Sequence, residues 1–165
     1  MNRPAPWVRS ITDVDVKQAA AIFEETPHDL TYEADLDSIL HDSECKVLVA
    51  GHYLRVDGFL VYQEFEGTVE IIHMAVAGDC ARRGVGTALL KCSLEIMPEH
   101  PFEAWVRETN LAAQLFLRKA GFQCVEILRD AYPCSGDSAY LFCLDDEGEA
   151  EWYGVRSEFK LKKAR

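Results

Sequence analysis

Hydrophobic residues follow two different periods along the chain, and the order of these periods predicts an α+β fold. Apolar residues recur at helical spacing in four segments, at 16–26, 31–42, 84–97 and 110–120. Runs rich in β-branched and aromatic residues predict seven strands, at 7–11, 46–52, 56–65, 69–77, 102–107, 124–128 and 139–144. Strands and helices do not alternate regularly, so we expect a mixed, mostly antiparallel sheet of six to seven strands flanked by about four helices.

The segment 69–90 contains the clearest candidate binding site, because a strand, a polar turn and a helix follow one another there. The turn holds Arg82, Arg83, Gly84 and Gly86. Glycines let the backbone approach a ligand, and the unpaired N–H groups of the first helical turn favour an anion. An ordinary turn would account for the glycines alone, but paired arginines add charge-assisted contacts to phosphate oxygens. The spacing fits neither a Walker loop nor the dinucleotide-binding motif.

Length, charge and cysteine content narrow the function classes. At 165 residues we expect a single domain over 1–144, with 145–165 as a C-terminal appendage. A net charge of −11 argues against nucleic-acid binding and favours a cationic substrate. No apolar run is long enough for a membrane span, and the N-terminus lacks the apolar core of a signal peptide. Six cysteines without C-x-x-C pairing predict free, mostly buried thiols, no metal site and a cytoplasmic protein.

Three motifs resemble those of the GNAT superfamily of acetyl-CoA-dependent N-acetyltransferases. Residues 81–86 resemble its pyrophosphate motif [QR]-x-x-G-x-[GA], with Ala81 at the first polar position. A second motif, N-x-[AS]-A followed by G-F, matches Asn110, Ala112, Ala113, Phe116, Gly121 and Phe122. Further on, Arg129, Tyr132-Pro133, Gly136-Asp137 and Ala139-Tyr140 resemble protein N-terminal acetyltransferases, most closely the bacterial ribosomal-protein-alanine type. The resemblance extends over about residues 45–144.

This resemblance implies the GNAT fold, acetyl-CoA as co-substrate and a set of cofactor contacts. The strand before the turn would bind the pantetheine arm, the turn would hold the pyrophosphate, and the second motif would lie near the sulfur. These contacts are, in that order, Met74, Ala75 and Val76; Arg82, Arg83, Gly84, Val85, Gly86 and Thr87; and Asn110 and Ala113. Taken alone, Asn110 is equally plausible as a helix N-cap, and Met74 and Val76 as core residues.

Glu70 is our candidate general base, because it lies on the strand before the turn, where several GNAT enzymes carry a catalytic glutamate. An exposed structural glutamate is the alternative. Strict alternation along the strand would place His73 on the opposite face. For the acid, Leu117 replaces the tyrosine usual in the family and Trp105 replaces the glutamate of the alanine-type enzymes. Tyr132 is the candidate acid, and Tyr140 is the alternative. The candidate substrate contacts are Glu103, Trp105, Arg129 and Tyr140.

Three functions fit these residues. The first choice is direct acetyl transfer, in a ternary complex, to a protein N-terminal amine, because an α-amino group is neutralised far more easily than a lysine. A small-molecule amine acetyltransferase is the second, and a non-catalytic acyl-CoA-binding protein is the third, motivated by Ala81, Trp105 and Leu117. The expected partner is therefore a protein N-terminus or a small amine, without nucleic acid or membrane, and the chain is expected to be a monomer or homodimer.

Overall fold

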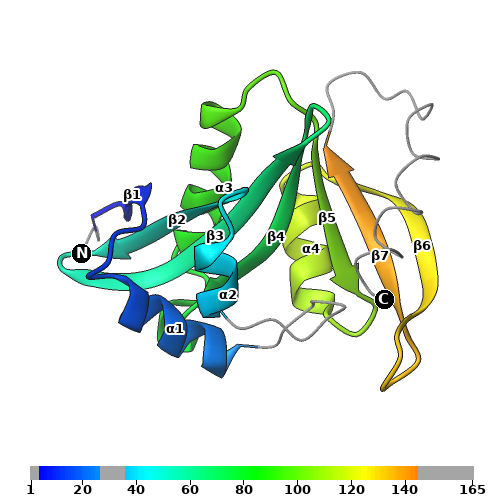
Figure 1. Ribbon diagram of the computed structural model, residues 1–165, viewed down its shortest axis with the longest axis horizontal. Helices are drawn as coiled ribbons and strands as arrows, with labels where there is room; N and C mark the ends of the chain where they lie inside the picture. Colours follow the sequence, from blue (N-terminus) through cyan, green and yellow to red (C-terminus); the bar gives the residue numbers. More distant parts are fainter. Residues whose placement is uncertain (1–3, 27–35, 145–165) are drawn as a thin grey trace. The chain divides into compact units, whose positions relative to one another are not determined.

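The computed structural model describes residues 4–26 and 36–144, which divide into two compact units (Figure 1). Among these residues, the first unit comprises 4–26 and 36–100, and the second comprises 101–144. The units together contain seven strands and four α-helices in the described part of the chain, which confirms the expected α+β class. The predicted C-terminal appendage and the first half of the helix predicted at 31–42 lie outside the described residues.

The first unit is built on four antiparallel strands in the order β1-β2-β3-β4. The turn between β3 and β4 confirms a prediction, since Glu66 and Gly67 both have positive φ, as in the two-residue hairpins that match strand twist. Its elements are β1 (Trp7–Ser10), α1 (Val16–Glu25), α2 (Leu36–His41), β2 (Cys45–His52), β3 (Arg55–Phe65), β4 (Thr68–Val76), a 3₁₀ turn η1 (Gly78–Cys80) and α3 (Val85–Ile96).

Helices cover both faces of this four-stranded sheet (Figure 1). On one face, Phe23 of α1 packs against Phe59 of β3, with ring centroids 6.3 Å apart. On the other face, α3 lies so close to β3 that Val85 fills the space beside Gly58. Both faces of β3 are therefore buried, which explains why its sequence is a continuous apolar run instead of an alternating one.

A β-bulge interrupts the alternation of β4. Tyr62 of β3 pairs with Ile71, and the preceding residue Val61 pairs with His73, so Ile72 has no partner in this register. Residues directly opposite each other point to the same face, and Gln63 pairs with Glu70. Glu70 and His73 therefore share one face of the sheet. The prediction that His73 lies opposite Glu70 is wrong, because strict alternation does not allow for the extra residue.

The second unit is a three-stranded antiparallel sheet in the order β5-β7-β6. Its elements are β5 (Phe102–Arg107), α4 (Leu111–Lys119), β6 (Gln123–Tyr132) and β7 (Asp137–Leu144). β6 extends four residues past the predicted end at 128, through an irregular stretch in which Asp130 has a φ of 52°. The register shift between Leu128 and Tyr132 brings Tyr132 opposite Asp137. This irregularity is why alternation in the sequence stops before the strand does.

Candidate functional site

The turn between β4 and α3 has the backbone geometry expected of an anion site. Arg82 and Gly84 both adopt positive φ, at 60° and 84°. Gly84 is the N-cap of α3 and has no side chain to satisfy the helix N–H groups, and its carbonyl already accepts from the Ala88 N–H at 2.9 Å. Among the described residues, no acceptor meets the N–H groups of residues 84–87. The start of α3 therefore presents unpaired donors and the positive end of the helix dipole.

The side chains of the turn suit the same ligand. Arg82 and Arg83 are exposed, and within the described ranges no carboxylate forms an ion pair with either of them. A Cβ placed on Gly84 would meet nothing within 4 Å, so the space beside the turn is open. Gly86 is half-buried and Thr87 exposed, whereas Val85 is buried and anchors the helix. Two free guanidinium groups, bare N–H donors and an open approach fit the pyrophosphate of acetyl-CoA.

Gly58 of β3 sets how closely α3 approaches the sheet. A Cβ at this position would lie 2.8 Å from the Ala75 carbonyl oxygen and 2.9 Å from Cγ1 of Val85. Only a residue without a side chain allows this contact. Since Val85 is the first residue of α3, the position of the candidate phosphate-binding turn at 82–87 depends on a glycine that lies 24 to 29 residues earlier in the sequence.

The three predicted pantetheine contacts lie on the C-terminal half of β4. Met74 and Val76 are half-buried and pair with Leu60 and Gly58, so they point to the α3 face. Ala75 is buried on the α1 face, opposite Phe59. Their role in cofactor binding stays a prediction. Met74 and Val76, for which a core position was the alternative, are only half-buried, whereas Ala75 is buried.

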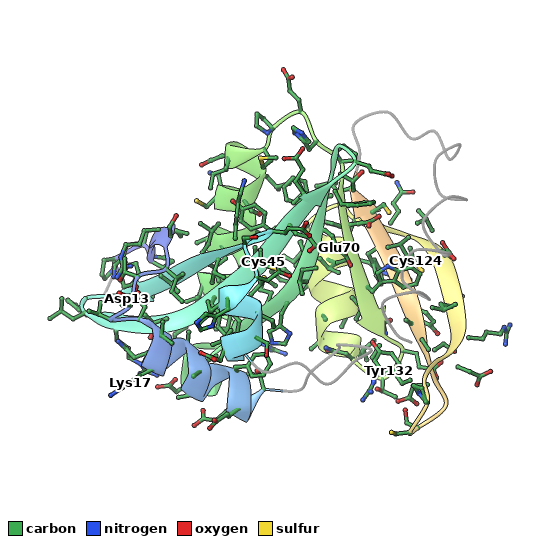
Figure 2. The ribbon with its side chains drawn as sticks, viewed as in Figure 1. Asp13, Lys17, Cys45, Glu70, Cys124 and Tyr132 are labelled. Atoms are coloured by element: carbon green, nitrogen blue, oxygen red, sulfur yellow. The ribbon has the colours of Figure 1, made fainter. Side chains whose placement is uncertain are left out.

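Glu70 lies on the α1 face of β4, half-buried, and is labelled in Figure 2. Gln63, which is buried on β3, donates from Nε2 to Oε2 of Glu70 across 3.2 Å. On the same face, His73 packs its ring 5.0 Å from Phe23 and 5.6 Å from Phe59. A carboxylate held in one orientation by an amide donor can act as a base, whereas His73 is 6 % exposed and belongs to an aromatic cluster.

Within the second unit, three of the predicted residues share one face of the sheet. Glu103 and Trp105 are two residues apart on β5, and Glu103 is buried. Tyr132 pairs with Asp137 on β7, which by alternation places it on that same face. Tyr140 pairs with Val106 and therefore points to the opposite face. Arg129 is exposed in the irregular part of β6. The predicted substrate contacts thus do not form one cluster.

Arg107, which the sequence analysis did not select, organises the surroundings of Tyr132. Its guanidinium carbon lies 3.9 Å from the centroid of the Tyr132 ring, and its Nε lies 3.6 Å from Oδ2 of Asp137. Tyr132 itself is buried and stands at the end of β6 in Figure 2. The V-R pair at the end of a strand, 25 residues before Tyr132, offered no signal of this contact in the sequence.

The second motif combines a cap and a core position. Asn110 is the N-cap of α4, and its Oδ1 accepts from the Ala113 N–H at 3.1 Å. The alternative interpretation of Asn110 as a helix cap is therefore confirmed, and the Ala113 N–H is already engaged. Leu117 is buried, at the position where the family usually carries a tyrosine. Roles of Asn110 and Ala113 in cofactor binding stay predictions.

Several other expectations concern the whole chain. All six cysteines are free, but only Cys80 and Cys143 are buried, so the expectation of mostly buried thiols is wrong. Solvent reaches the remaining four because Cys45 and Cys124 lie at the starts of strands, Cys92 is only half-buried on α3, and Cys134 lies in the turn between β6 and β7. No cluster of candidate metal ligands occurs in the described ranges. Likewise, none of the helices described is both long and apolar enough to cross a bilayer.

The sequence and the fold were compared with those of known proteins. The model of the acetyltransferase (GNAT) family matches residues 9–122. No curated protein matches the sequence significantly. Among solved structures, Ard1 from Thermoplasma volcanium is 25% identical with a TM-score of 0.72, and the match covers 86% of this chain and 97% of that one.

Two further solved structures show the same fold at lower identity. The ribosomal-protein-S18-alanine N-acetyltransferase from Escherichia coli is 19% identical with a TM-score of 0.71, covering 88% of this chain and 99% of that one. A provisionally assigned streptothricin acetyltransferase from Bacillus anthracis, solved with acetyl coenzyme A, is 16% identical with a TM-score of 0.70, covering 87% and 98%. Since the family model spans well over half of the sequence and ends inside the second motif, the chain belongs to the GNAT family of acetyltransferases.

Proposed function

We propose that this protein is an N-acetyltransferase that moves the acetyl group of acetyl-CoA to the α-amino group of a protein N-terminus. The observation that carries the proposal is the open turn at 82–87, with its unpaired N–H groups and two free arginines. These groups would hold the pyrophosphate, and Met74 to Val76 would contact the pantetheine arm. When bound, acetyl-CoA supplies an acetyl thioester, which is an activated acyl group.

Glu70 supplies the base in this proposal. An α-amino group with a pKa near 7.7–8.0 costs only about 1 kcal/mol to neutralise at pH 7, whereas a lysine costs about 4–5 kcal/mol. A single carboxylate, acting directly or through one water, can therefore prepare an α-amine for attack on the thioester carbonyl. The hydrogen bond from Gln63 holds the Glu70 carboxylate in one orientation, so it loses little entropy when the amine binds.

The choice of a protein N-terminus as acceptor is supported by the net charge of the protein and by residues of the second unit. With a net charge of −11, the protein attracts a cationic N-terminus before that amine is neutralised. Trp105 and Glu103 lie on one face of β5 and are the proposed contacts of the acceptor peptide. Tyr132 shares that face and is the proposed acid that protonates the departing thiolate. This acid contributes little to the rate, because a thiol with a pKa near 8.5 is a good leaving group. One of the structural neighbours, the S18-alanine enzyme, is named for a protein acceptor, and this supports the choice of a protein N-terminus.

The test is a calorimetric titration with acetyl-CoA, followed by thiol release against a panel of acceptors. The panel should include peptides with free N-termini, the same peptides with blocked N-termini and an internal lysine, and small polyamines. Release on free N-termini alone supports the proposal, and release on small amines alone replaces it with a small-molecule acetyltransferase. Binding without release on any acceptor supports a non-catalytic acyl-CoA-binding protein, and no binding refutes all three.

The variant Glu70→Gln separates a base from a structural residue. Glutamine keeps an acceptor for the Gln63 amide, so the fold and the acetyl-CoA affinity should be retained while kcat falls by roughly 10²- to 10⁴-fold. Glu99→Gln, at an exposed position outside the site, is the matched control. Direct transfer in a ternary complex further predicts intersecting initial-rate lines when both substrates are varied. Parallel lines, or unchanged kcat in Glu70→Gln, would contradict the proposed mechanism.

A further inference from the structure

The phosphate-binding turn contains an acidic residue whose charge opposes its function. Asp79 lies in η1, three residues before Arg82 and four before Arg83. The turn is compact, since the Cys80 N–H donates to the Ala77 carbonyl and the Arg83 N–H donates to the Cys80 carbonyl. A free carboxylate here would repel an anionic ligand and would compete with phosphate for the two arginines. If the turn is to bind pyrophosphate, the Asp79 carboxylate must therefore be paired with another cation.

Arg55, at the start of β3, forms this ion pair with Asp79. Its two terminal nitrogens donate to the two carboxylate oxygens of Asp79, at 2.8 Å and 2.7 Å, in the parallel geometry that matches guanidinium to carboxylate. The two residues are 24 positions apart in the sequence. Both side chains are about half exposed, so the pair forms at the surface of the unit.

A buried carboxylate fixes the direction in which Arg55 points. Nε of Arg55 lies 3.2 Å from Oδ1 of Asp57, whose side chain is 3% exposed. The other Asp57 oxygen lies 2.7 Å from Nδ1 of His52. The Asp57 backbone carbonyl also accepts from the Ala77 N–H at 2.8 Å, which joins the start of β3 to the end of β4. The Asp57 carboxylate thus fixes Nε of Arg55, and the two terminal nitrogens of the guanidinium point at the turn.

Arg83, four residues after Asp79 in the same compact turn, is a second cation whose charge acts on this carboxylate. The hydrogen bonds from Arg55 are the largest cause that lowers the pKa of Asp79 to about 2, and the charge of Arg83 contributes in the same direction. If Arg55 were removed, Asp79 would therefore retain one cationic neighbour, and that neighbour belongs to the phosphate-binding pair. An Asp79–Arg83 ion pair would then withdraw a guanidinium from the cofactor.

We infer that Arg55 is a positioning residue for the cofactor, because it holds the Asp79 carboxylate away from Arg82 and Arg83 and so keeps both available for the pyrophosphate. This inference rests on the proposed function, since it assumes that the turn binds acetyl-CoA. It differs from a simple brace between β3 and the turn in one respect. If the pair only braced the turn, removing either residue would weaken acetyl-CoA binding equally. Here, removing Asp79 should not weaken binding, and it should also restore the affinity lost when Arg55 is removed.

The experiment compares Arg55→Met, Asp79→Asn and the double variant by titration with acetyl-CoA at low salt, and by KM and kcat. Arg55→Met should raise Kd and KM by roughly two- to fivefold with kcat unchanged, the range expected when a partly exposed ion pair competes with the ligand. Asp79→Asn should bind at least as tightly as the wild type, and the double variant should match it. Lys46→Met, which removes an exposed cation on β2, controls for the change in net charge.

Two further measurements secure the interpretation. With acetyl-pantetheine, which lacks phosphates, Arg55→Met and wild type should show the same KM. If Arg55→Met does not fold because Asp57 loses a partner, Arg55→Lys and Asp79→Asn alone still decide the question. The inference is overturned if Asp79→Asn weakens acetyl-CoA binding as much as Arg55→Met does, or if the double variant binds as weakly as Arg55→Met. Neither result overturns the proposed function. A wild-type protein that does not bind acetyl-CoA overturns both.

Discussion

Replacing Gly58 by alanine should destabilise the protein and weaken cofactor binding through a single added methyl group. The new Cβ would lie 2.8 Å from the Ala75 carbonyl oxygen, 2.9 Å from Val85 Cγ1 and 3.2 Å from Val76 Cγ2. The carbonyl belongs to the neighbouring strand and cannot move independently, so the helix has to shift. Overpacking of this kind costs about 1–3 kcal/mol, and alanine recovers roughly 0.5–1 kcal/mol of backbone entropy in the unfolded chain. We expect a net loss of about 1–2 kcal/mol.

Urea denaturation followed by circular dichroism measures this loss, which corresponds to a midpoint lower by roughly 0.5–1 M for an m-value of about 2 kcal/mol/M. Because Val85 begins α3, its displacement also moves the phosphate-binding turn, so Kd for acetyl-CoA should rise in the same variant. Gly78→Ala is the stability control, since a Cβ there meets nothing within 4 Å and its φ is not positive. A Gly58→Ala protein as stable as the wild type, with unchanged Kd, would refute the argument that this glycine sets the approach of α3.

Three further predictions concern single sites. Gly84→Ala should lower stability by about 1–2 kcal/mol in a thermal melt, because its φ of 84° strains an L-residue although the Cβ meets no atom. Converting Arg82 and Arg83 to glutamine should raise Kd for acetyl-CoA and flatten its salt dependence; an unchanged slope would exclude them as phosphate ligands. The hydrogen bonds from Arg9 hold the pKa of the buried Asp15 carboxyl at about 2, below its ordinary 3.8. Asp15→Asn should therefore cost about 2 kcal/mol above pH 4, and the difference should vanish as pH falls toward 2 in urea melts.

Local patterns in the sequence predicted most of the fold. Each predicted strand and helix in the described ranges is present, because the chain changes between a period of two and a period of 3.6 at recognisable turn residues. The Glu66-Gly67 hairpin and the glycine at the start of α3 were predicted for the same reason, since both depend only on adjacent residues. The glycines and paired arginines at 82–86 predicted an anion-binding turn from adjacent residues alone, and the exposed arginines and unpaired N–H groups agree with that prediction. The resemblance to the family added the pyrophosphate of acetyl-CoA as the expected ligand.

Contacts between distant residues were not predictable in this way. The Arg55–Asp79 pair and the stacking of Arg107 on Tyr132 each join residues about 25 positions apart, and nothing in either neighbourhood signals the partner. Such pairs depend on strand register, which the bulge in β4 changes in the first unit and the irregular stretch between Leu128 and Tyr132 changes in the second. Residues 129–132 were likewise missed as strand, because a positive φ at Asp130 breaks the alternation that identifies strands.

The bulge at Ile72 divides β4 into two segments with opposite phase. Before it, odd-numbered residues such as Val69 face α3 and Glu70 faces α1; after it, His73 and Ala75 face α1 while Met74 and Val76 face α3. The Glu70 carboxylate and the predicted pantetheine contacts Met74 and Val76 therefore lie on opposite faces of one strand, on either side of the bulge. Deleting Ile72 would leave every other residue of β4 on its present face, because His73 would then follow Ile71 in regular alternation opposite Val61 and Tyr62. A one-residue deletion is thus tolerated in the facing of β4 at this position, and a relative without the bulge should be aligned with a gap at Ile72 so that its residues keep the same faces.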